Sequence, residues 1–339
     1  MTPCPVHDHL PDGFLDAPAQ RILDVLHGPA LIELPGRAGA PLFVSTLLHG
    51  NEDSGLVALQ EVLRRHAGKP LPRPLILFIG NVRAAAQNLR TLPDQLDFNR
   101  IWPGALLADC DQTRLARFVY DHVAARAPFA AIDIHNNTGL NPHYSCVANL
   151  NPRDIALSQL FSRIVVHSQR PLGTAAQAFA ELCPSITAEC GKSGDALGAE
   201  HAARLVEAAL AIAHLPDHPP APQDVDLLRT YAIVRPPKGA SFSFDGTPAD
   251  FMFRPDIDHL NFSELAAGAS FGKAQGGARL EIAPGEGDEP PENYFDYANG
   301  DIRLTRNAMP AMLTLDPRAV RLDCLCYLMH RIGLDGRRV

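Results

Sequence analysis

The sequence of 339 residues lacks any apolar run approaching the roughly 18 residues that a membrane-spanning helix needs. Its start has neither the basic n-region nor the apolar h-region of a secretory leader. Basic residues are fewer than acidic ones, 30 against 38, which gives a net charge of −8. This balance argues against nucleic acid or a membrane as the main partner. The negative net charge does not exclude a small anionic ligand, because a pocket lined by arginine can be locally positive.

A disulfide framework is also not indicated, because the seven cysteines are odd in number and irregular in spacing. A reducing, cytoplasmic location is therefore expected. Apolar residues make up 46% of the chain and charged residues 20%, which is an ordinary globular balance that permits a large core. The length suits two domains, or one larger domain with a smaller one attached.

Strand-like and helix-like segments alternate along the first two thirds of the chain. Amphipathic patterns predict helices over residues 56–68, 113–127 and 195–215. Short apolar runs between them predict buried strands: PLFVSTLLH, PLILFIGN, FAAIDIHN, SRIVVHS and PSITAEC. The alternation predicts an α/β domain over residues 1–217, with a mostly parallel or mixed central sheet and helices on both faces. Ligands of such sheets bind at the strand ends.

The composition changes after residue 215. PDHPPAPQD is rich in proline and is typical of a linker. Short strand-like pieces separated by Gly, Pro and Asp follow, so we predict a β-rich C-terminal domain over residues 218–339. The segment at 284–293 is expected to be a surface loop, and the apolar tail at 320–333 suits either a final strand or a helix.

A histidine and a glutamate, His49 and Glu52, follow the first predicted strand of the α/β domain, and His135 ends another. Two histidines and a carboxylate form a ligand set that suits zinc. Asp133 lies two residues before His135 on the same face of its strand, where it could orient the imidazole. Taken singly, His49 and Glu52 fit a solvated turn, and His135 fits a core histidine.

Three further polar positions stand at strand ends or in the loops that follow them. Arg83 and the pair Asn99–Arg100 offer arginine side chains that match a carboxylate or stabilise charge on a carbonyl oxygen. Glu189 ends a strand and could transfer a proton. Taken singly, the arginines equally fit surface ion pairs, and the glutamate fits a helix cap or a salt bridge.

The joint order of these motifs resembles the zinc carboxypeptidase-like (M14-type) superfamily, and within it the succinylglutamate desuccinylase/aspartoacylase family. The resemblance covers roughly residues 40–215 and implies an α/β fold followed by a β-domain that narrows access to the site. The motifs that carry it are HGNE at 49–52, GNVRA at 80–84, DFNRIWPG at 97–104, DIHNNTG at 133–139 and TAECG at 187–191.

The resemblance implies a zinc-dependent amidohydrolase, or deacylase, that cleaves the amide bond of a small N-acyl amino acid with metal-activated water. One zinc ion per chain is implied, together with a substrate that carries a carboxylate. The implied roles are zinc binding for His49, Glu52 and His135, general base and acid for Glu189, polarisation of the scissile carbonyl for Arg83, and substrate binding for Asn99 and Arg100.

Two alternatives remain open at this point: a zinc carboxypeptidase acting on peptides or cell-wall fragments, and a noncatalytic ligand-binding protein on the same fold. Departures from the family pattern, such as NVRA without a proline after the asparagine and DFNR in place of DLNR, leave the acyl group and the amine portion undetermined. Whether the chain forms a homo-oligomer is also left open by the sequence.

Overall fold

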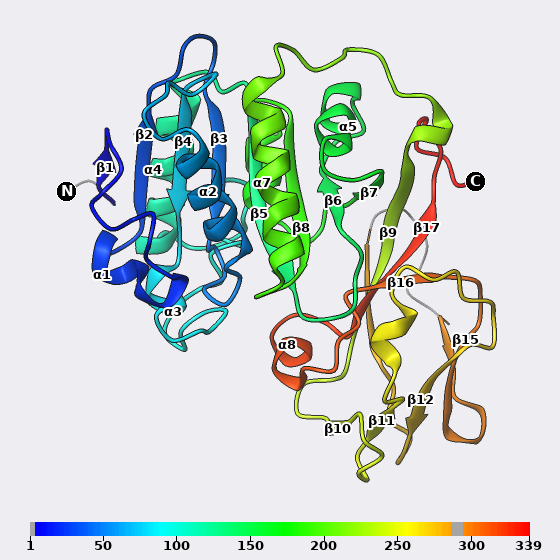
Figure 1. Cartoon of the computed structure of the whole chain (residues 1–339). Helices are drawn as coiled ribbons and strands as arrows, with labels where there is room; N and C mark the ends of the chain where they lie inside the picture. Colours follow the sequence, from blue (N-terminus) through cyan, green and yellow to red (C-terminus); the bar gives the residue numbers. More distant parts are fainter. Residues whose placement is uncertain (1–3, 286–293) are drawn as a thin grey trace. The chain divides into compact units, whose positions relative to one another are not determined.

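A computed structural model describes residues 4–285 and 294–339, so most of the loop expected at 284–293 lies outside the described residues. The chain forms two compact units, one of residues 1–136 and 143–226, the other of residues 137–142 and 227–339. The predicted fold class is confirmed, with a large mixed sheet and its helices, and a separate smaller sheet near the C-terminus (Figure 1).

The sheet of the first unit is mixed. Its strands follow one another in the order β1-β2-β4-β3-β5-β8-β6-β7. β3 runs parallel to both β4 and β5, whereas β2 is antiparallel to β4 and β6 is antiparallel to β8. The strands are β1 (Val6–His7), β2 (Ala30–Leu34), β3 (Leu42–Thr46), β4 (Leu75–Ile79), β5 (Ala130–Asn137), β6 (Tyr144–Val147), β7 (Ile164–His167) and β8 (Ser185–Lys192).

Helices of the first unit pack on both faces of this sheet, as the sequence predicted. α2 and α7 lie side by side on one face, where buried alanines of α7 allow the close approach of α2 (Figure 1). On the other face, Val119 of α4 belongs to the same buried apolar cluster as Phe43 of β3 and Phe78 of β4. The helices are α1 (Ile22–Leu26), α2 (Ser54–Arg65), α3 (Val82–Ala85), α4 (Asp111–Ala124), α5 (Pro152–Gln159), α6 (Ala175–Phe179) and α7 (Ala196–Ala211).

The second unit is built mainly of short strands. Five of them form a sheet in the order β10-β11-β12-β15-β14, while β9 pairs antiparallel with β13 and β17, and β17 pairs with β16. The apolar tail contains both alternatives, because a helix precedes the final strand. The elements are β9 (Asp226–Arg235), β10 (Phe242–Ser243), β11 (Phe251–Phe253), β12 (Ser270–Ala274), β13 (Glu281–Pro284), β14 (Phe295–Asp296), β15 (Asp301–Leu304), β16 (Met309–Ala311), α8 (Pro317–Leu322) and β17 (Cys326–Arg331).

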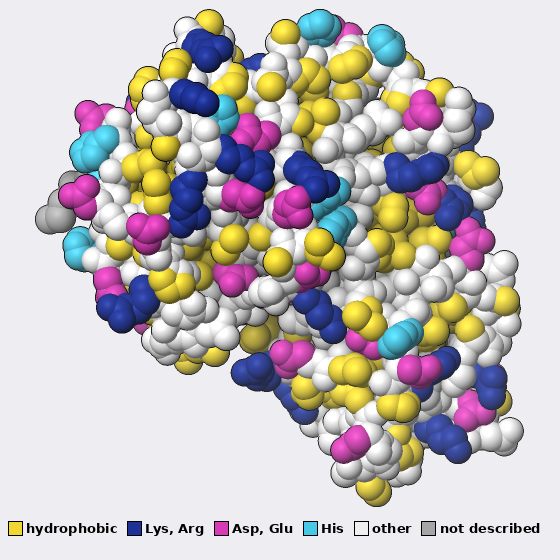
Figure 2. Space-filling model, viewed as in Figure 1, with side chains coloured by type: hydrophobic (Ala, Val, Ile, Leu, Met, Phe, Trp, Pro, Cys, Tyr) yellow, Lys and Arg dark blue, Asp and Glu magenta, His cyan; other side chains and the backbone are white. Residues whose placement is uncertain are grey.

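Among the described residues, no helix is both long and apolar enough to cross a membrane. On the visible face of the molecule, basic and acidic side chains are interspersed rather than gathered by sign (Figure 2). That face therefore offers no extended basic area of the kind that nucleic-acid binding uses.

A buried carboxyl group in α5 makes the stability of the fold depend on pH. Asp154 is 1% exposed, and its Oδ1 accepts a hydrogen bond from the Ser185 amide at 2.9 Å. Burial raises the pKa of Asp154 to about 6, although hydrogen bonds from Ser185 and Asn151 oppose the shift. The folded state therefore holds this proton more tightly than the unfolded state, whose carboxyl has a pKa of about 3.9.

Asp154→Asn is expected to gain stability relative to the wild type as the pH rises. The contribution of protonated Asp154 is fully present below about pH 4 and is lost as the pH rises through about 6, which amounts to about 3 kcal/mol. Urea unfolding of both proteins in chelator, from about pH 4 to about pH 8, measures the difference. A difference that stays constant across this range would contradict the prediction.

Candidate active site

The loop between β3 and α2 brings His49 and Glu52 together. It bends tightly, since the Glu52 amide donates to the His49 carbonyl at 3.1 Å. Gly50 is required here, because a Cβ at this position would lie 2.2 Å from the Ala85 amide nitrogen of α3. The Gly50 amide also donates to the Arg90 carbonyl at 3.1 Å, which ties the loop to the segment after α3.

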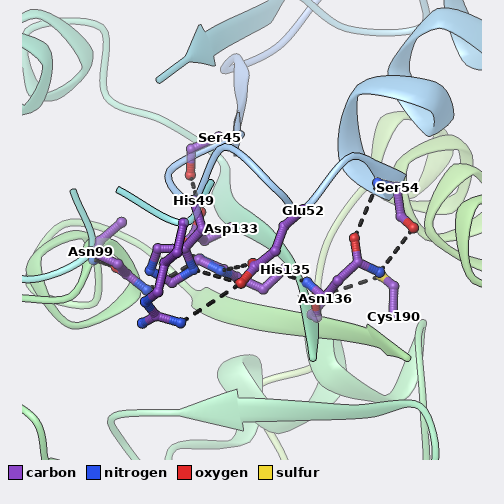
Figure 3. Close-up of polar contacts among 12 residues, drawn as sticks. Ser45, His49, Glu52, Ser54, Asn99, Asp133, His135, Asn136 and Cys190 are labelled. Carbon is purple, nitrogen blue, oxygen red and sulfur yellow. Dashed lines mark hydrogen bonds and ion pairs between the residues drawn. The ribbon is translucent and has the colours of Figure 1, made fainter. Parts of the chain in front are cut away.

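His135 reaches the same place from the neighbouring strand β5. Nδ1 of His49 lies 2.7 Å from Oε1 of Glu52, and Nδ1 of His135 lies 2.7 Å from Oε2 of the same carboxylate. All three side chains are buried, and their potential ligand atoms lie within 4.8 Å of one another. Figure 3 shows the two imidazoles converging on Glu52. The fold therefore brings together the three residues that the sequence offers as zinc ligands.

The donor set fits a zinc ion. Two imidazole nitrogens and two carboxylate oxygens cannot face one another as bare lone pairs at these distances, so the cluster requires either protons or a cation. Burial alone would raise the pKa of Glu52, but the charges of His49 and His135 outweigh it and hold the pKa below its ordinary value. An ionised glutamate and two imidazoles offer oxygen and nitrogen ligands of the kinds that zinc binds.

Two aspartates hold the far sides of the imidazoles. Nε2 of His49 lies 3.0 Å from Oδ1 of Asp97, and Nε2 of His135 lies 2.7 Å from Oδ2 of Asp133. The Ser45 hydroxyl donates to the other oxygen of Asp133 at 2.7 Å. With Nε2–H donated to a carboxylate, each ring keeps Nδ1 for an ion. Asp133 thus lies where the sequence placed it, whereas the part of Asp97 was not foreseen.

Asp97→Asn is expected to weaken zinc binding by about 10- to 100-fold, the usual cost of losing a carboxylate that orients a ligand histidine. The amide can still accept a hydrogen bond from Nε2 of His49, but it no longer carries the negative charge that strengthens this bond. Competition titration against a chromophoric chelator measures the zinc Kd. Asp24→Asn is the matched control, because Asp24 is exposed and pairs with Arg21. Equal affinities in both variants would contradict the role of Asp97.

An arginine that sequence reasoning missed lies against the triad. Arg90 donates from Nε and Nη2 to Oδ2 of Asp97 at 3.2 and 3.0 Å, and its Nη1 lies 3.9 Å from Oε1 of Glu52. Burial would raise the pKa of Asp97, but His49 and Arg90 together hold it below the ordinary range. Arg83, by contrast, is exposed on α3, and the described residues give it no hydrogen bond or ion pair with the triad.

The sequence does contain a hint of the role of Arg90, although no apolar pattern shows that its side chain faces the site. The segment LRTLPDQLDFNR places an arginine seven residues before Asp97, in the same loop as the DFNR motif. Arg83, by contrast, lies close to the end of a predicted strand, where ligands of such sheets bind. The carbonyl role expected of Arg83 stays a prediction, and Arg90 is now a second candidate for it.

Asn99 lies beside the triad. Its Nδ2 lies 3.1 Å from Nε2 of His135, and its Oδ1 accepts the Ala175 amide at the start of α6 at 2.9 Å. Arg100 follows it and donates from Nη1 to the Asn99 carbonyl at 2.7 Å. Asn99 therefore lies beside a candidate zinc ligand, and the binding of a substrate carboxylate by Asn99 and Arg100 stays a prediction.

Glu189 lies on β8, opposite Tyr144 of β6, and its side chain is partly exposed. The pKa of its neighbour Cys190 is affected by the surrounding charges. Burial raises the pKa of the Cys190 thiol well above its usual value, and the carboxylates of Glu189 and Glu52 add to this shift. The role of Glu189 as general base stays a prediction.

The catalytic-domain model of the succinylglutamate desuccinylase/aspartoacylase family matches residues 38–215, which is more than half of the chain. No curated protein sequence matches the chain.

Solved structures share the fold at low sequence identity. The succinylglutamate desuccinylase from Chromobacterium violaceum is 17% identical with a TM-score of 0.57, over 88% of this chain and 86% of that one. The succinylglutamate desuccinylase/aspartoacylase from Rhodobacter sphaeroides is 15% identical with a TM-score of 0.60, over 88% of each chain. Murine aminoacylase 3 is 15% identical with a TM-score of 0.54, over 88% of this chain and 97% of that one. The match over residues 38–215 shows that the chain belongs to the succinylglutamate desuccinylase/aspartoacylase family, within the zinc carboxypeptidase-like superfamily.

Proposed function

We propose that the protein is a zinc-dependent amidohydrolase that removes the acyl group from a small N-acyl amino acid. The observation that carries the proposal is the buried triad, in which both imidazole Nδ1 atoms face the two oxygens of Glu52. His49, Glu52 and His135 would hold one zinc ion per chain. When bound, zinc supplies a Lewis acid for the scissile carbonyl and lowers the pKa of water.

The remaining chemistry falls to side chains around the triad. Glu189 takes the proton of the attacking water and passes it to the departing nitrogen. An arginine, Arg83 or Arg90, donates hydrogen bonds to the oxygen on which negative charge develops. Asn99 and Arg100 orient the substrate through its carboxylate, since the guanidinium matches that group bidentately.

The family and the names of the related structures support the proposed substrate class. A desuccinylase and an aminoacylase both release an amine from an acyl group, and both share this fold. Membership of the family supports hydrolysis of an amide bond. The departures in the NVRA and DFNR motifs leave both the acyl chain and the amino acid to be determined by experiment.

A substrate panel tests the proposal. Purified protein is assayed for bound metal and for release of amine from N-acetyl and N-succinyl derivatives of acidic, basic and apolar amino acids. We expect turnover of at least one compound, loss of it in chelator, and recovery with added zinc. Full activity in zinc-free protein would overturn the zinc dependence. Turnover of unblocked peptides alone would favour a carboxypeptidase, and binding without turnover would favour a noncatalytic protein.

A further inference from the structure

Asn136 directly follows a candidate zinc ligand and uses both of its side-chain polar atoms. Its Nδ2 donates to the Ser54 hydroxyl at 2.9 Å and to the Gly191 carbonyl at 3.0 Å. Its Oδ1 accepts the Ser54 amide at 3.1 Å. The side chain is 4% exposed, so these partners take the place of water. Figure 3 shows it reaching Ser54 from β5.

These three hydrogen bonds join segments that are distant in sequence. Ser54 begins α2 and lies two residues after Glu52, while Gly191 lies two residues after Glu189 on β8. The main chain of Asn136 adds a fourth contact, since its amide donates to Oε2 of Glu52 at 3.1 Å. One residue therefore connects the loop that carries Glu52, the strand that carries His135 and the strand that carries Glu189.

A second set of contacts ties the same two segments together. The Asp53 carboxylate accepts the Ser193 hydroxyl at 2.7 Å and the Gly194 amide at 3.1 Å. These contacts are exposed, so water competes for them and each contributes little. The Asn136 contacts are buried, and removing them leaves the Ser54 amide and the Gly191 carbonyl without their partner. Asn136 therefore provides the buried hydrogen bonds that link the start of α2 to the end of β8.

We propose that Asn136 is a positioning residue that sets the place of Glu189 relative to the His49–Glu52–His135 triad. The inference rests on the proposed function for its kinetic consequence, but not for its structural one. Asn136 does not contact the reacting atoms through its side chain. It acts by fixing the end of β8 against the start of α2. This keeps Glu189 at a constant position relative to the metal ligands.

The test compares Asn136→Ala with Asn151→Ala. Asn151 caps α5 by accepting the Asp154 amide at 3.0 Å and also bonds the Asp154 side chain, so its loss destabilises the fold at α5 and the start of β8 rather than at the end of β8. A misplacement of about 1 Å costs roughly 100-fold in rate. We expect kcat of Asn136→Ala to fall about 100-fold on the best substrate of the panel, with KM changed by less than about threefold. Asn151→Ala should keep both values.

Two readouts do not depend on activity. The zinc Kd of Asn136→Ala should stay within about tenfold of the wild type, because the three ligands and the backbone amide of residue 136 are retained. Removing a carboxylate that supports a ligand histidine is expected to weaken zinc binding more. Amide hydrogen exchange, followed by mass spectrometry, should become faster over residues 189–194 in Asn136→Ala and not in Asn151→Ala.

Unchanged exchange over residues 189–194, or a kcat no lower than that of Asn151→Ala, would overturn the proposal. If the wild type hydrolyses no compound, the proposed function fails, while the exchange comparison still decides whether Asn136 positions the end of β8. If Asn136→Ala does not fold, Ser54→Ala replaces it. This variant loses only the hydroxyl contact, so a drop in kcat of about tenfold with faster exchange over the same residues supports the proposal, and wild-type behaviour in both overturns it.

Discussion

Replacing Glu189 with glutamine is expected to lower kcat by about 10²- to 10⁴-fold, the contribution typical of a positioned general acid and base. Glutamine has nearly the same size and still forms hydrogen bonds, but it cannot take a proton from water. Zinc content should stay at the wild-type level, because the ligand atoms belong to His49, Glu52 and His135. The measurement is kcat on the best compound of the panel, together with metal analysis of the same preparation.

Glu181→Gln is the matched control for this experiment. Glu181 lies in the loop before β8 and is exposed, so the same chemical change there should leave kcat within about twofold. A Glu189→Gln enzyme with a kcat near that of the wild type would exclude the carboxylate as the proton acceptor. Loss of zinc along with activity would instead indicate that Glu189 supports the metal, and the roles of the two glutamates would have to be reassigned.

The triad was predictable because its position follows from the regular part of the fold. β3 and β5 are parallel neighbours, with Ser45 in register with Asp133, so a loop after β3 and a histidine at the end of β5 must meet at one edge of the sheet. Apolar runs and helical periodicity suffice to locate these strands. His49, Glu52 and His135 could therefore be grouped from sequence spacing and ligand chemistry, without knowledge of any distance.

The surroundings of the triad were less predictable because they come from irregular chain. Asp97, Asn99 and Arg90 all lie between α3 and α4, in a stretch with no repeating apolar pattern to show which side chains face inward. The loop is fixed instead by contacts such as the Gly50 amide with the Arg90 carbonyl. The sequence therefore gave no role to Asp97 or to Arg90. Asn99 lies beside His135, and its expected contact with a substrate stays a prediction.

Replacing Arg83 and Arg90 in turn decides which of them stabilises the charge that develops on the scissile carbonyl. Arg90→Ala is expected to lower kcat by about 10²- to 10³-fold, the usual cost of removing a donor that faces developing negative charge. Arg83→Ala should leave kcat within about twofold, because that side chain is exposed. Both changes remove the same group from positions seven residues apart, so each variant serves as the control for the other.

Arg90 has a second effect that the measurement must resolve. Its Nε and Nη2 donate to Asp97, which in turn holds His49, so its loss should also weaken zinc binding modestly. Assays at saturating zinc isolate the effect on kcat, and the zinc Kd is titrated separately. A loss of kcat that vanishes at saturating zinc would confine Arg90 to supporting the metal. A large loss in Arg83→Ala with little in Arg90→Ala would return the carbonyl role to Arg83, and would require its exposed side chain to reach the substrate on binding.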